Sequence, residues 1–138
     1  MLSKKILVVE DNHDIRALLE IVLTSWGWDA VLAKTGGEAL VTLKTQTPRV
    51  ILLDMRLPDM SGLELAAILK SHPFYGHIPI LATSALHHDY ARKRCLAAGC
   101  EGFLAKPFKV PELEARIANL ASLERQKTIA ATGYESAM

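Results

Sequence analysis

Residues 51–62 read ILLDMRLPDMSG, a stretch that passes from hydrocarbon side chains to a carboxylate at Asp54. With Val50 it gives the run VILLD at residues 50–54, which is typical of a strand buried on both faces of a sheet. Helices must then cover both faces, so this run predicts an α/β fold with a parallel sheet. Functional sites of such sheets lie beyond the carboxyl ends of the strands, and Asp54 stands at that end.

Apolar runs and helical patterns alternate along the whole chain. The predicted strands cover residues 6–9, 29–33, 50–54, 78–85 and 102–107. A helical stripe after the first strand consists of Ile15, Leu18, Leu19, Val22, Leu23 and Trp26. Thr35 with Glu38, and Ser61 with Glu64, have capping-box spacing and predict two further helix starts. This alternation predicts a doubly wound, five-stranded parallel sheet with helices on both faces.

The two tryptophans are predicted to differ in burial. Trp26 continues the apolar stripe of the first helix and is predicted to lie in the core. Trp28 follows Gly27, where that helix is predicted to end, and is expected to be half exposed.

Length and composition bound the class of protein. The chain has 138 residues, half of them hydrophobic, and a formal net charge of +1. This length suits one domain, which we place at residues 4–122, with a tail at 123–138 that is expected to be frayed. No basic surplus favours direct DNA binding, and no apolar run reaches the roughly 20 residues of a membrane span. With two cysteines, Cys95 and Cys100, expected to be reduced, the sequence predicts a cytoplasmic protein.

Acidic residues follow two of the predicted strands. Glu10 and Asp11 follow the first strand, and Asp54 ends the third. If these strands are neighbours, the three carboxylates converge, and such a cluster persists only with a cation to neutralise it. Oxygen ligands of this kind suit Mg²⁺ better than Zn²⁺. The alternative is that each acid only caps the helix that follows it.

Two further polar groups follow the remaining strands. Lys106 lies at the end of the fifth predicted strand, and a hydroxyl lies at the end of the fourth, in ATSA at residues 82–85. An aspartate beside Mg²⁺ can attack a phosphoryl group to give an acyl phosphate, and a lysine can neutralise the phosphoryl oxygens.

Together these fragments resemble the receiver domain of two-component response regulators. The resemblance rests on VVED at 8–11, LLDMRLPDMSG at 52–62, ATSA at 82–85 and GCEGFLAKPF at 99–108, in this order and spacing. It implies a flavodoxin-like (βα)5 fold with the strand order 2-1-3-4-5. It also implies a phosphorylation-dependent signalling receiver that is not an enzyme beyond catalysing its own phosphorylation and dephosphorylation at Asp54.

The resemblance assigns a metal site and a phosphoacceptor. Asp54 matches the phosphoacceptor of the family, and Asp11 matches a direct ligand of Mg²⁺, with Mn²⁺ as an alternative ion. Glu10 matches the second acid of the site, and the backbone carbonyl of Arg56 matches the remaining protein ligand.

The resemblance also assigns residues that contact the phosphoryl group or respond to it. Lys106 matches the phosphate-contacting lysine, and its bond to Pro107 is expected to be cis. The family places its switch hydroxyl about 22 residues before this lysine, which selects Ser84. Thr83 should face the opposite side of the strand, because side chains alternate. Phe103 matches the switch aromatic, although its position also suits ordinary core packing.

Partners are implied by the same resemblance. A histidine kinase or a histidine phosphotransfer protein would be the phosphodonor. A downstream protein would bind the face made by the fourth helix, the fifth strand and the fifth helix. A phosphorylation-dependent homodimer is an alternative use of the receiver. Neither DNA nor a membrane is expected as a direct partner. We expect a stand-alone single-domain response regulator; the alternative is a receiver module excised from a longer regulator or hybrid histidine kinase.

Two positions depart from the pattern of the family. Arg56 and Leu86 lie where this family tunes access of water to the acyl phosphate, so the sequence does not predict the lifetime of that group.

Three rival classes of protein remain for comparison. An aspartyl-nucleophile phosphatase of the haloacid dehalogenase type needs a D-x-D motif after the first strand, where this chain has EDN at 10–12. A flavodoxin needs a phosphate loop there, and a receiver that never takes phosphate does not need the complete set of acids.

Overall fold

The computed structural model describes residues 4–86 and 88–132, with side chains described for residues 4–86 and 89–123. The chain forms one parallel sheet in the order β2-β1-β3-β4-β5, which confirms the predicted topology. The strands are β1 (Lys5–Val9), β2 (Asp29–Ala33), β3 (Val50–Asp54), β4 (Ile80–Ser84) and β5 (Gly102–Ala105). The helices are α1 (His13–Ser25), α2 (Gly36–Leu43), α3 (Gly62–Lys70), α4 (His88–Ala97) and α5 (Val110–Thr132).

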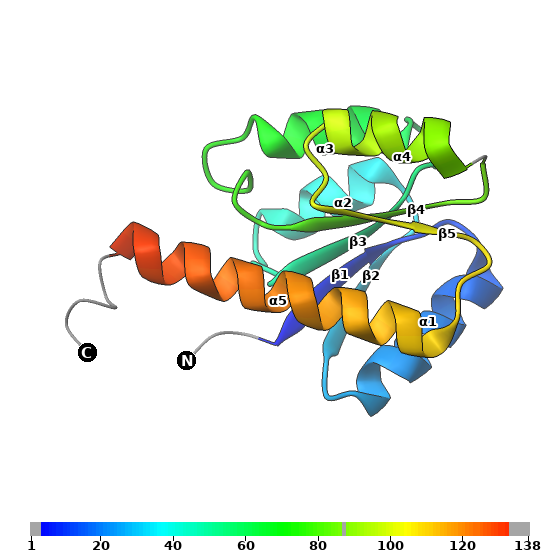
Figure 1. Ribbon diagram of the computed structural model, residues 1–138, viewed down its shortest axis with the longest axis horizontal. Coiled ribbons are helices and arrows are strands. Elements are labelled where there is room, and N and C mark those ends of the chain that lie inside the picture. The colour runs from blue at the N-terminus through cyan, green and yellow to red at the C-terminus, as the bar shows by residue number, and fades with distance from the viewer. Residues whose placement is uncertain (1–3, 87, 133–138) are drawn as a thin grey trace.

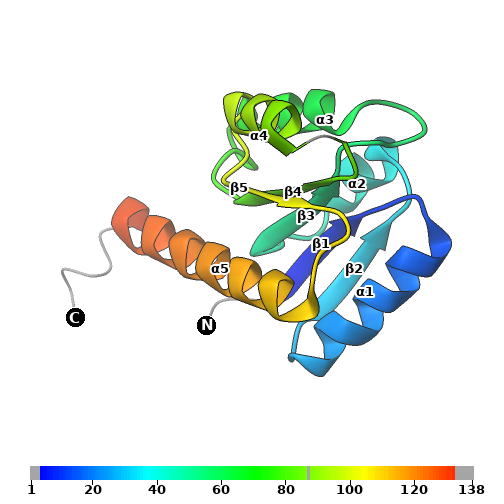
Figure 2. The same cartoon turned by 45° about the vertical axis from the view of Figure 1, so that its right-hand side comes forward.

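Helices cover both faces of the sheet, with α1 and α5 on one face and α2, α3 and α4 on the other (Figure 1, Figure 2). Each strand serves both layers because its side chains alternate in direction. Leu7 and Val9 of β1 belong to the core under α2, α3 and α4, whereas Ile6 and Val8 belong to the core under α1 and α5. The central strands therefore need apolar residues at every position, which is the pattern that identified β3 in the sequence.

Side-chain caps start the helices where the sequence predicts. The Thr35 hydroxyl accepts from the backbone N of Glu38 at 3.0 Å, and the Ser61 hydroxyl accepts from the backbone N of Glu64 at 3.1 Å. These bonds satisfy amide groups that have no partner within the first turn of a helix. Ser61 thus begins α3 directly after the loop that follows Asp54.

The last helix is longer than predicted. The sequence pattern predicted a domain that ends at residue 122 with a frayed tail, but α5 continues as a helix to Thr132. The residues beyond 122 include good helix formers, and the first helix breaker is Gly133. Residues 133–138 of the predicted tail lie outside the described part of the chain. In residues 4–86 and 88–132, none of the helices combines the length and the apolar character needed to cross a membrane.

Trp28 is more deeply buried than Trp26, which is the reverse of the prediction. Trp26 is partly buried against the core under α1 and α5, whereas Trp28 is a buried member of that core. Lys4 and Arg49 lie over the Trp28 ring, with Nζ 5.2 Å and Cζ 5.8 Å from its centroid. Cations at this distance cover an aromatic face and interact with it favourably, which the local sequence did not indicate.

The two cysteines are free thiols, as expected for a reduced protein. Cys95 and Cys100 are both buried. Burial raises the pKa of Cys95, and raises the pKa of Cys100 to about 12. Both groups are therefore held as neutral thiols and act as apolar core residues.

A close approach at Gly62 fixes the start of α3 against the end of β3. The backbone N of Gly62 donates to the carbonyl of Met55 at 2.8 Å. A Cβ at Gly62 would lie 2.5 Å from the carbonyl oxygen of Asp54 and 2.6 Å from Cα of Met55. Both are backbone atoms, so the neighbours have little freedom to move away.

Gly62→Ala should therefore lower the free energy of unfolding by about 2–3 kcal/mol, as overpacking of a rigid site does. Gly37→Ala is the matched control, because a Cβ there would meet only the Asp59 carboxylate at 3.4 Å and the Thr35 hydroxyl at 3.8 Å. That control should be neutral or stabilising by up to about 1 kcal/mol, since alanine favours a helix. Urea unfolding measures both, and equal stabilities of the two variants would contradict the close approach.

Candidate functional site

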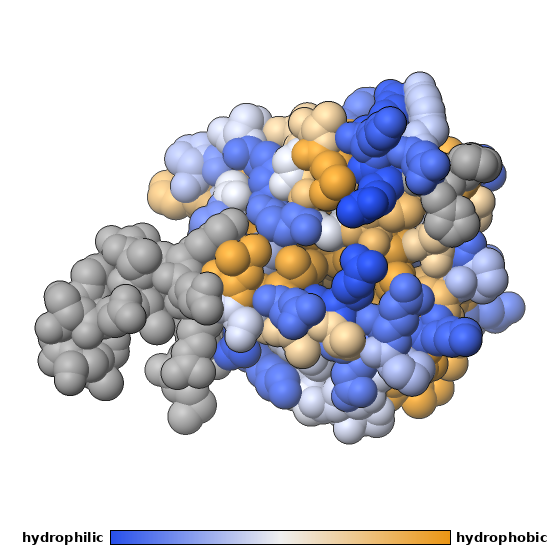
Figure 3. All heavy atoms as spheres, in the orientation of Figure 1, coloured by the Kyte–Doolittle hydropathy of each residue, from blue (hydrophilic) through white to orange (hydrophobic). Residues whose placement is uncertain are grey.

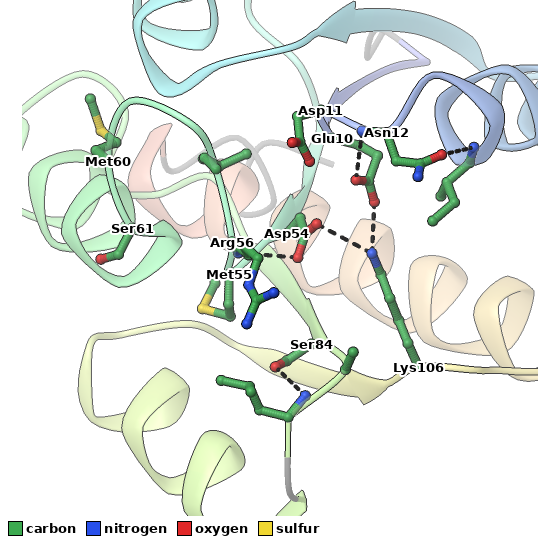
Figure 4. A pocket seen from close by; sticks show the side chains of 14 residues that line it. Glu10, Asp11, Asn12, Asp54, Met55, Arg56, Met60, Ser61, Ser84 and Lys106 are labelled. Atoms are coloured by element: carbon green, nitrogen blue, oxygen red, sulfur yellow. Dashed lines mark hydrogen bonds and ion pairs between the residues drawn. The ribbon is translucent and has the colours of Figure 1, made fainter.

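Three carboxylates converge at the carboxyl ends of β1 and β3, which are neighbours in the sheet. Glu10 and Asp11 follow β1 directly, and Asp54 is the last residue of β3. One oxygen from each of the three carboxylates lies within 4.8 Å of the others. Figure 4 shows them directed toward a common cleft. The convergence of the three carboxylates that the sequence predicts is therefore present.

Lys106 reaches this cluster from the end of β5. Its Nζ donates to Oε1 of Glu10 at 2.8 Å and to Oδ2 of Asp54 at 3.2 Å (Figure 4). The two acids and the lysine come from three different strands, because parallel strands present all their carboxyl ends at one edge. The bond between Lys106 and Pro107 is cis.

The charges at this edge strongly influence one another. Burial raises the pKa of Glu10, which is only 3% exposed. Lys106 lowers this pKa through its hydrogen bond, and the Asp54 carboxylate raises it further. Burial favours the neutral amine of Lys106, but Glu10 and Asp54 outweigh it and raise the pKa of Lys106. Lys106 is therefore firmly cationic at neutral pH, while Glu10 carries a charge that burial disfavours.

The acids line a cleft of about 600 Å³. The β3–α3 loop forms one wall, where the backbone N of Arg56 donates to Oδ1 of Asp54 at 3.2 Å. Ser84 and Leu86 form part of the opposite wall, and the Ser84 hydroxyl accepts from the backbone N of Leu86 at 3.0 Å. Thr83 lines a second, small cavity beside Phe108 that shares Glu10, Asp54 and Lys106 with the cleft. Because side chains alternate along β4, the two hydroxyls lie on different sides of the strand.

Comparison with known proteins identifies this arrangement. The sequence model of the response regulator receiver domain matches residues 6–118. The chain belongs to this family. Receiver domains take a phosphoryl group from histidine kinases, bind Mg²⁺ in an acidic pocket and act on downstream targets.

Curated relatives include both longer and shorter regulators. The phosphate regulon transcriptional regulatory protein PhoB from Rhizobium meliloti is 37% identical over 123 residues, which is 89% of this chain but 53% of PhoB. The polar-differentiation response regulator DivK from Brucella ovis is 33% identical over 110 residues, which is 80% of this chain and 89% of DivK. This receiver therefore spans about half of the first relative and most of the second.

Solved receiver structures share the fold. The CheY-like receiver domain protein from Methanospirillum hungatei has a TM-score of 0.82 and 25% identity, covering 91% of this chain and 99% of its own. The receiver domain of a sensor histidine kinase from Pseudomonas aeruginosa has a TM-score of 0.80 and 31% identity, covering 88% of this chain and 99% of its own. That second structure holds a magnesium ion in its active-site cleft.

The residues of this receiver fit a divalent cation on their own chemistry. Three carboxylates face one lysine ammonium, which leaves an excess of two negative charges when all three are ionised. The Asp11 side chain is exposed to solvent, so a partly hydrated ion has access to it. An all-oxygen set with room for water suits Mg²⁺.

The remaining sequence-predicted residue, Phe103, lies away from the cleft. It is buried in β5, in the core under α2, α3 and α4, and lines a cavity that opens between α4 and α5. Its backbone carbonyl accepts from Nη1 of Arg116 at 3.0 Å. Core packing is thus present at Phe103, and its role in switching stays a prediction.

Two residues near the site were not found from the sequence. Arg16 is buried in α1 and donates to the backbone carbonyls of Glu10 and Asp11. Asp59 accepts from the backbone N of Gly36 at 2.9 Å and of Gly37 at 2.8 Å. These bonds lower the pKa of Asp59 and attach the β3–α3 loop to the start of α2. Neither role leaves a local sequence signal, because the partners become neighbours only after folding.

Proposed function

We propose that this receiver accepts a phosphoryl group on Asp54 from phosphohistidine of a histidine kinase or a histidine phosphotransfer protein. One observation carries the proposal: the Asp54 carboxylate lines an open cleft beside two further carboxylates, with Nζ of Lys106 at 3.2 Å from Oδ2. A carboxylate that is both accessible and charge-compensated can act as a nucleophile toward phosphorus.

The transfer follows from the placement of these groups. An Asp54 oxygen forms a bond to phosphorus as the phosphorus–nitrogen bond of phosphohistidine breaks, and the electron pair of that bond stays on the imidazole. Arg56 holds the acceptor in place through its backbone N, 3.2 Å from Oδ1. Lys106 neutralises phosphoryl oxygens from the side opposite Arg56. Mg²⁺, held by Glu10, Asp11, Asp54 and the Arg56 carbonyl, or Mn²⁺ in its place, would supply further neutralisation.

Phosphorylation then acts on the β4–α4 side of the cleft. The Ser84 hydroxyl accepts from the backbone N of Leu86, so its own proton is available to a phosphoryl oxygen across the cleft. Movement of Ser84 toward that oxygen frees space behind β4, into which Phe103 turns. The phosphoryl group thereby shifts an equilibrium between two arrangements through contacts made in only one of them.

The face that reads this change is formed by α4, β5 and α5. It carries a cavity of about 390 Å³ whose walls include Phe103 and four charged side chains, namely Asp89, Arg92, Glu112 and Arg116. Figure 3 shows this face, on which apolar atoms lie between the hydrophilic side chains of α4 and α5. Mixed charge around an apolar centre suits a protein partner, which is either a downstream target or a second copy of the chain.

Signalling by protein contact in the cytoplasm completes the proposal. We propose a stand-alone regulator, with a receiver module of a longer regulator or hybrid histidine kinase as the alternative. In either case we propose that the receiver catalyses only its own phosphorylation and dephosphorylation, and binds neither DNA nor a membrane directly.

Intact-mass measurement tests the central step. With acetyl phosphate and Mg²⁺, the protein should gain about 80 Da, the mass of one phosphoryl group. Chelation of Mg²⁺ by EDTA should prevent the gain, because the excess negative charge at the cleft then repels the donor. A phosphorylated histidine phosphotransfer protein should serve as an alternative donor. Absence of any gain from both donors, with folded protein and Mg²⁺, would contradict the proposed function.

A further inference from the structure

Arg16 occupies a position that is unfavourable for a cation in two respects, its burial and its place in a helix. Its residue is only 8% exposed, and charged side chains are seldom buried without a partner of opposite charge. It lies in the first turn of α1, where the helix dipole disfavours a cation. Among the described side chains, none forms an ion pair with Arg16. An arginine in this place must therefore make interactions that offset these costs.

Within the described residues, the Arg16 side chain makes two hydrogen bonds, both to the backbone that carries the acids of the cleft. Its Nη1 donates to the carbonyl of Glu10 at 3.0 Å and to the carbonyl of Asp11 at 3.1 Å. Arg16 does not itself line the cleft. Its guanidinium thus approaches the Glu10–Asp11 segment through the main chain and forms no hydrogen bond with the carboxylate of either residue.

These bonds also determine a donor on the cleft side of the same segment. Because a peptide unit is planar, a fixed Asp11 carbonyl fixes the direction of the Asn12 N–H as well. That N–H points to Oε2 of Glu10 at 3.2 Å. The Asn12 side chain in turn accepts from the backbone N of Ile15 at 3.0 Å and caps α1. Through these hydrogen bonds Arg16 helps to fix the position of the Glu10 carboxylate.

Lys106 and Arg16 divide two tasks between them. Lys106 contacts the carboxylates of Glu10 and Asp54 and neutralises charge there. The Arg16 guanidinium donates to main-chain carbonyls. Resting on the proposed function, we propose that Arg16 is a positioning residue that holds Glu10 and Asp11 in the arrangement that binds Mg²⁺. Groups that orient metal ligands from behind typically change metal affinity when they are removed.

The direction of the effect separates positioning from simple electrostatics. Arg16→Met removes a positive charge near a cation site, so electrostatics alone predicts tighter Mg²⁺ binding. Loss of positioning predicts weaker binding, by about 10-fold. Arg16→Lys keeps the charge and some donors on a shorter side chain, so it should retain part of the affinity. Lys70→Met is the matched control, because Nζ of Lys70 also donates to two backbone carbonyls, those of Gly76 and Ile78, but at the other end of the sheet.

Isothermal titration with Mg²⁺ alone measures the affinity of all four proteins, and urea unfolding shows that each is folded. We expect progressively weaker binding from wild type to Arg16→Lys to Arg16→Met, with folded Lys70→Met equal to wild type. Hydrogen exchange at the Asn12 amide of the Lys variant, which keeps the charge, should be faster than in the wild type. Unchanged or tighter Mg²⁺ binding by the Arg16 variants would overturn the inference. Failure of the wild type to bind Mg²⁺ would instead contradict the proposed function.

Discussion

Asp54→Asn is expected to take up no phosphoryl group while keeping the stability of the wild type. The carboxamide nearly matches the carboxylate in shape and keeps an oxygen for the backbone N of Arg56, but it is not a nucleophile. The substitution removes an attraction to Lys106 at 3.2 Å and a repulsion with Glu10, and the two changes oppose each other. The free energy of unfolding should thus change by less than about 1 kcal/mol. The mass gain from acetyl phosphate should fall at least about a hundredfold.

Asp59→Asn provides the matched control for this loss. Asp59 lies in the same loop as Arg56, but its carboxylate accepts from the backbone N of Gly36 and Gly37 at the start of α2. Its removal should weaken that cap and leave phosphoryl uptake intact. A phosphoryl group that persists on Asp54→Asn, attached to Glu10 or Asp11, would contradict the assignment of the nucleophile.

The fold could be predicted from the sequence because its information is local. The apolar run of β3 requires burial on both faces, and Thr35 and Ser61 begin helices through bonds three residues away. The strand order was less accessible to pattern alone and came from the family resemblance. The end of α5 was missed because a fading apolar stripe was read as the end of the helix, although helix-forming residues continue to Thr132.

The site was predictable to the extent that it consists of strand ends. All four residues lie at or just after the carboxyl end of a strand, so a parallel sheet brings them to one edge, namely Glu10, Asp11, Asp54 and Lys106. The nucleophile candidate, Asp54, ends β3, whereas a haloacid dehalogenase-type phosphatase has its motif after the first strand. The loop after β1 presents acids, whereas a flavodoxin has hydrogen-bond donors to a phosphate there. This geometry therefore disfavours both rival classes.

The residues that were missed, or placed wrongly, act through contacts that no local pattern announces. Arg16 looks like an ordinary solvated helix residue until its guanidinium is seen on two carbonyls. Trp28 was expected to be half exposed because it follows a turn, yet Lys4 and Arg49 cover it. In both cases a long cationic side chain reaches across the fold, and its direction depends on tertiary structure.

Lys106→Met should impair both the chemistry and the stability of this receiver. The variant lacks the only side chain among the described residues that forms ion pairs with Glu10 and Asp54. Loss of a charged group aimed at the phosphoryl oxygens should slow uptake from acetyl phosphate about a hundredfold. The buried Glu10 carboxylate loses its partner, which should lower the free energy of unfolding at pH 7 by about 2 kcal/mol, less than for a fully buried pair.

This loss of stability should depend on pH in a specific direction. The pKa of Lys106 is raised, so its contribution is fully present at neutral pH and disappears only as pH rises through that raised value. The pKa of Glu10 is also raised, so on acidification Glu10 takes a proton and no longer needs a cation. The difference in stability between wild type and Lys106→Met should therefore shrink as pH falls below neutral, since Glu10 takes its proton at a higher pH than an ordinary glutamate. Urea unfolding across this range measures it.

Two further variants separate the chemical role of Lys106 from its structural one. Adding Glu10→Gln to Lys106→Met removes the unpaired carboxylate, so stability should recover while uptake stays slow. Lys70→Met removes another lysine from an ion pair, since Nζ of Lys70 lies 2.8 Å from Glu101 at the other end of the sheet. That variant should be less stable, but its folded molecules should take up the phosphoryl group at the rate of the wild type. If Lys70→Met slowed uptake as much as Lys106→Met, general loosening of the fold would explain both, and Lys106 would have no specific part in phosphoryl transfer.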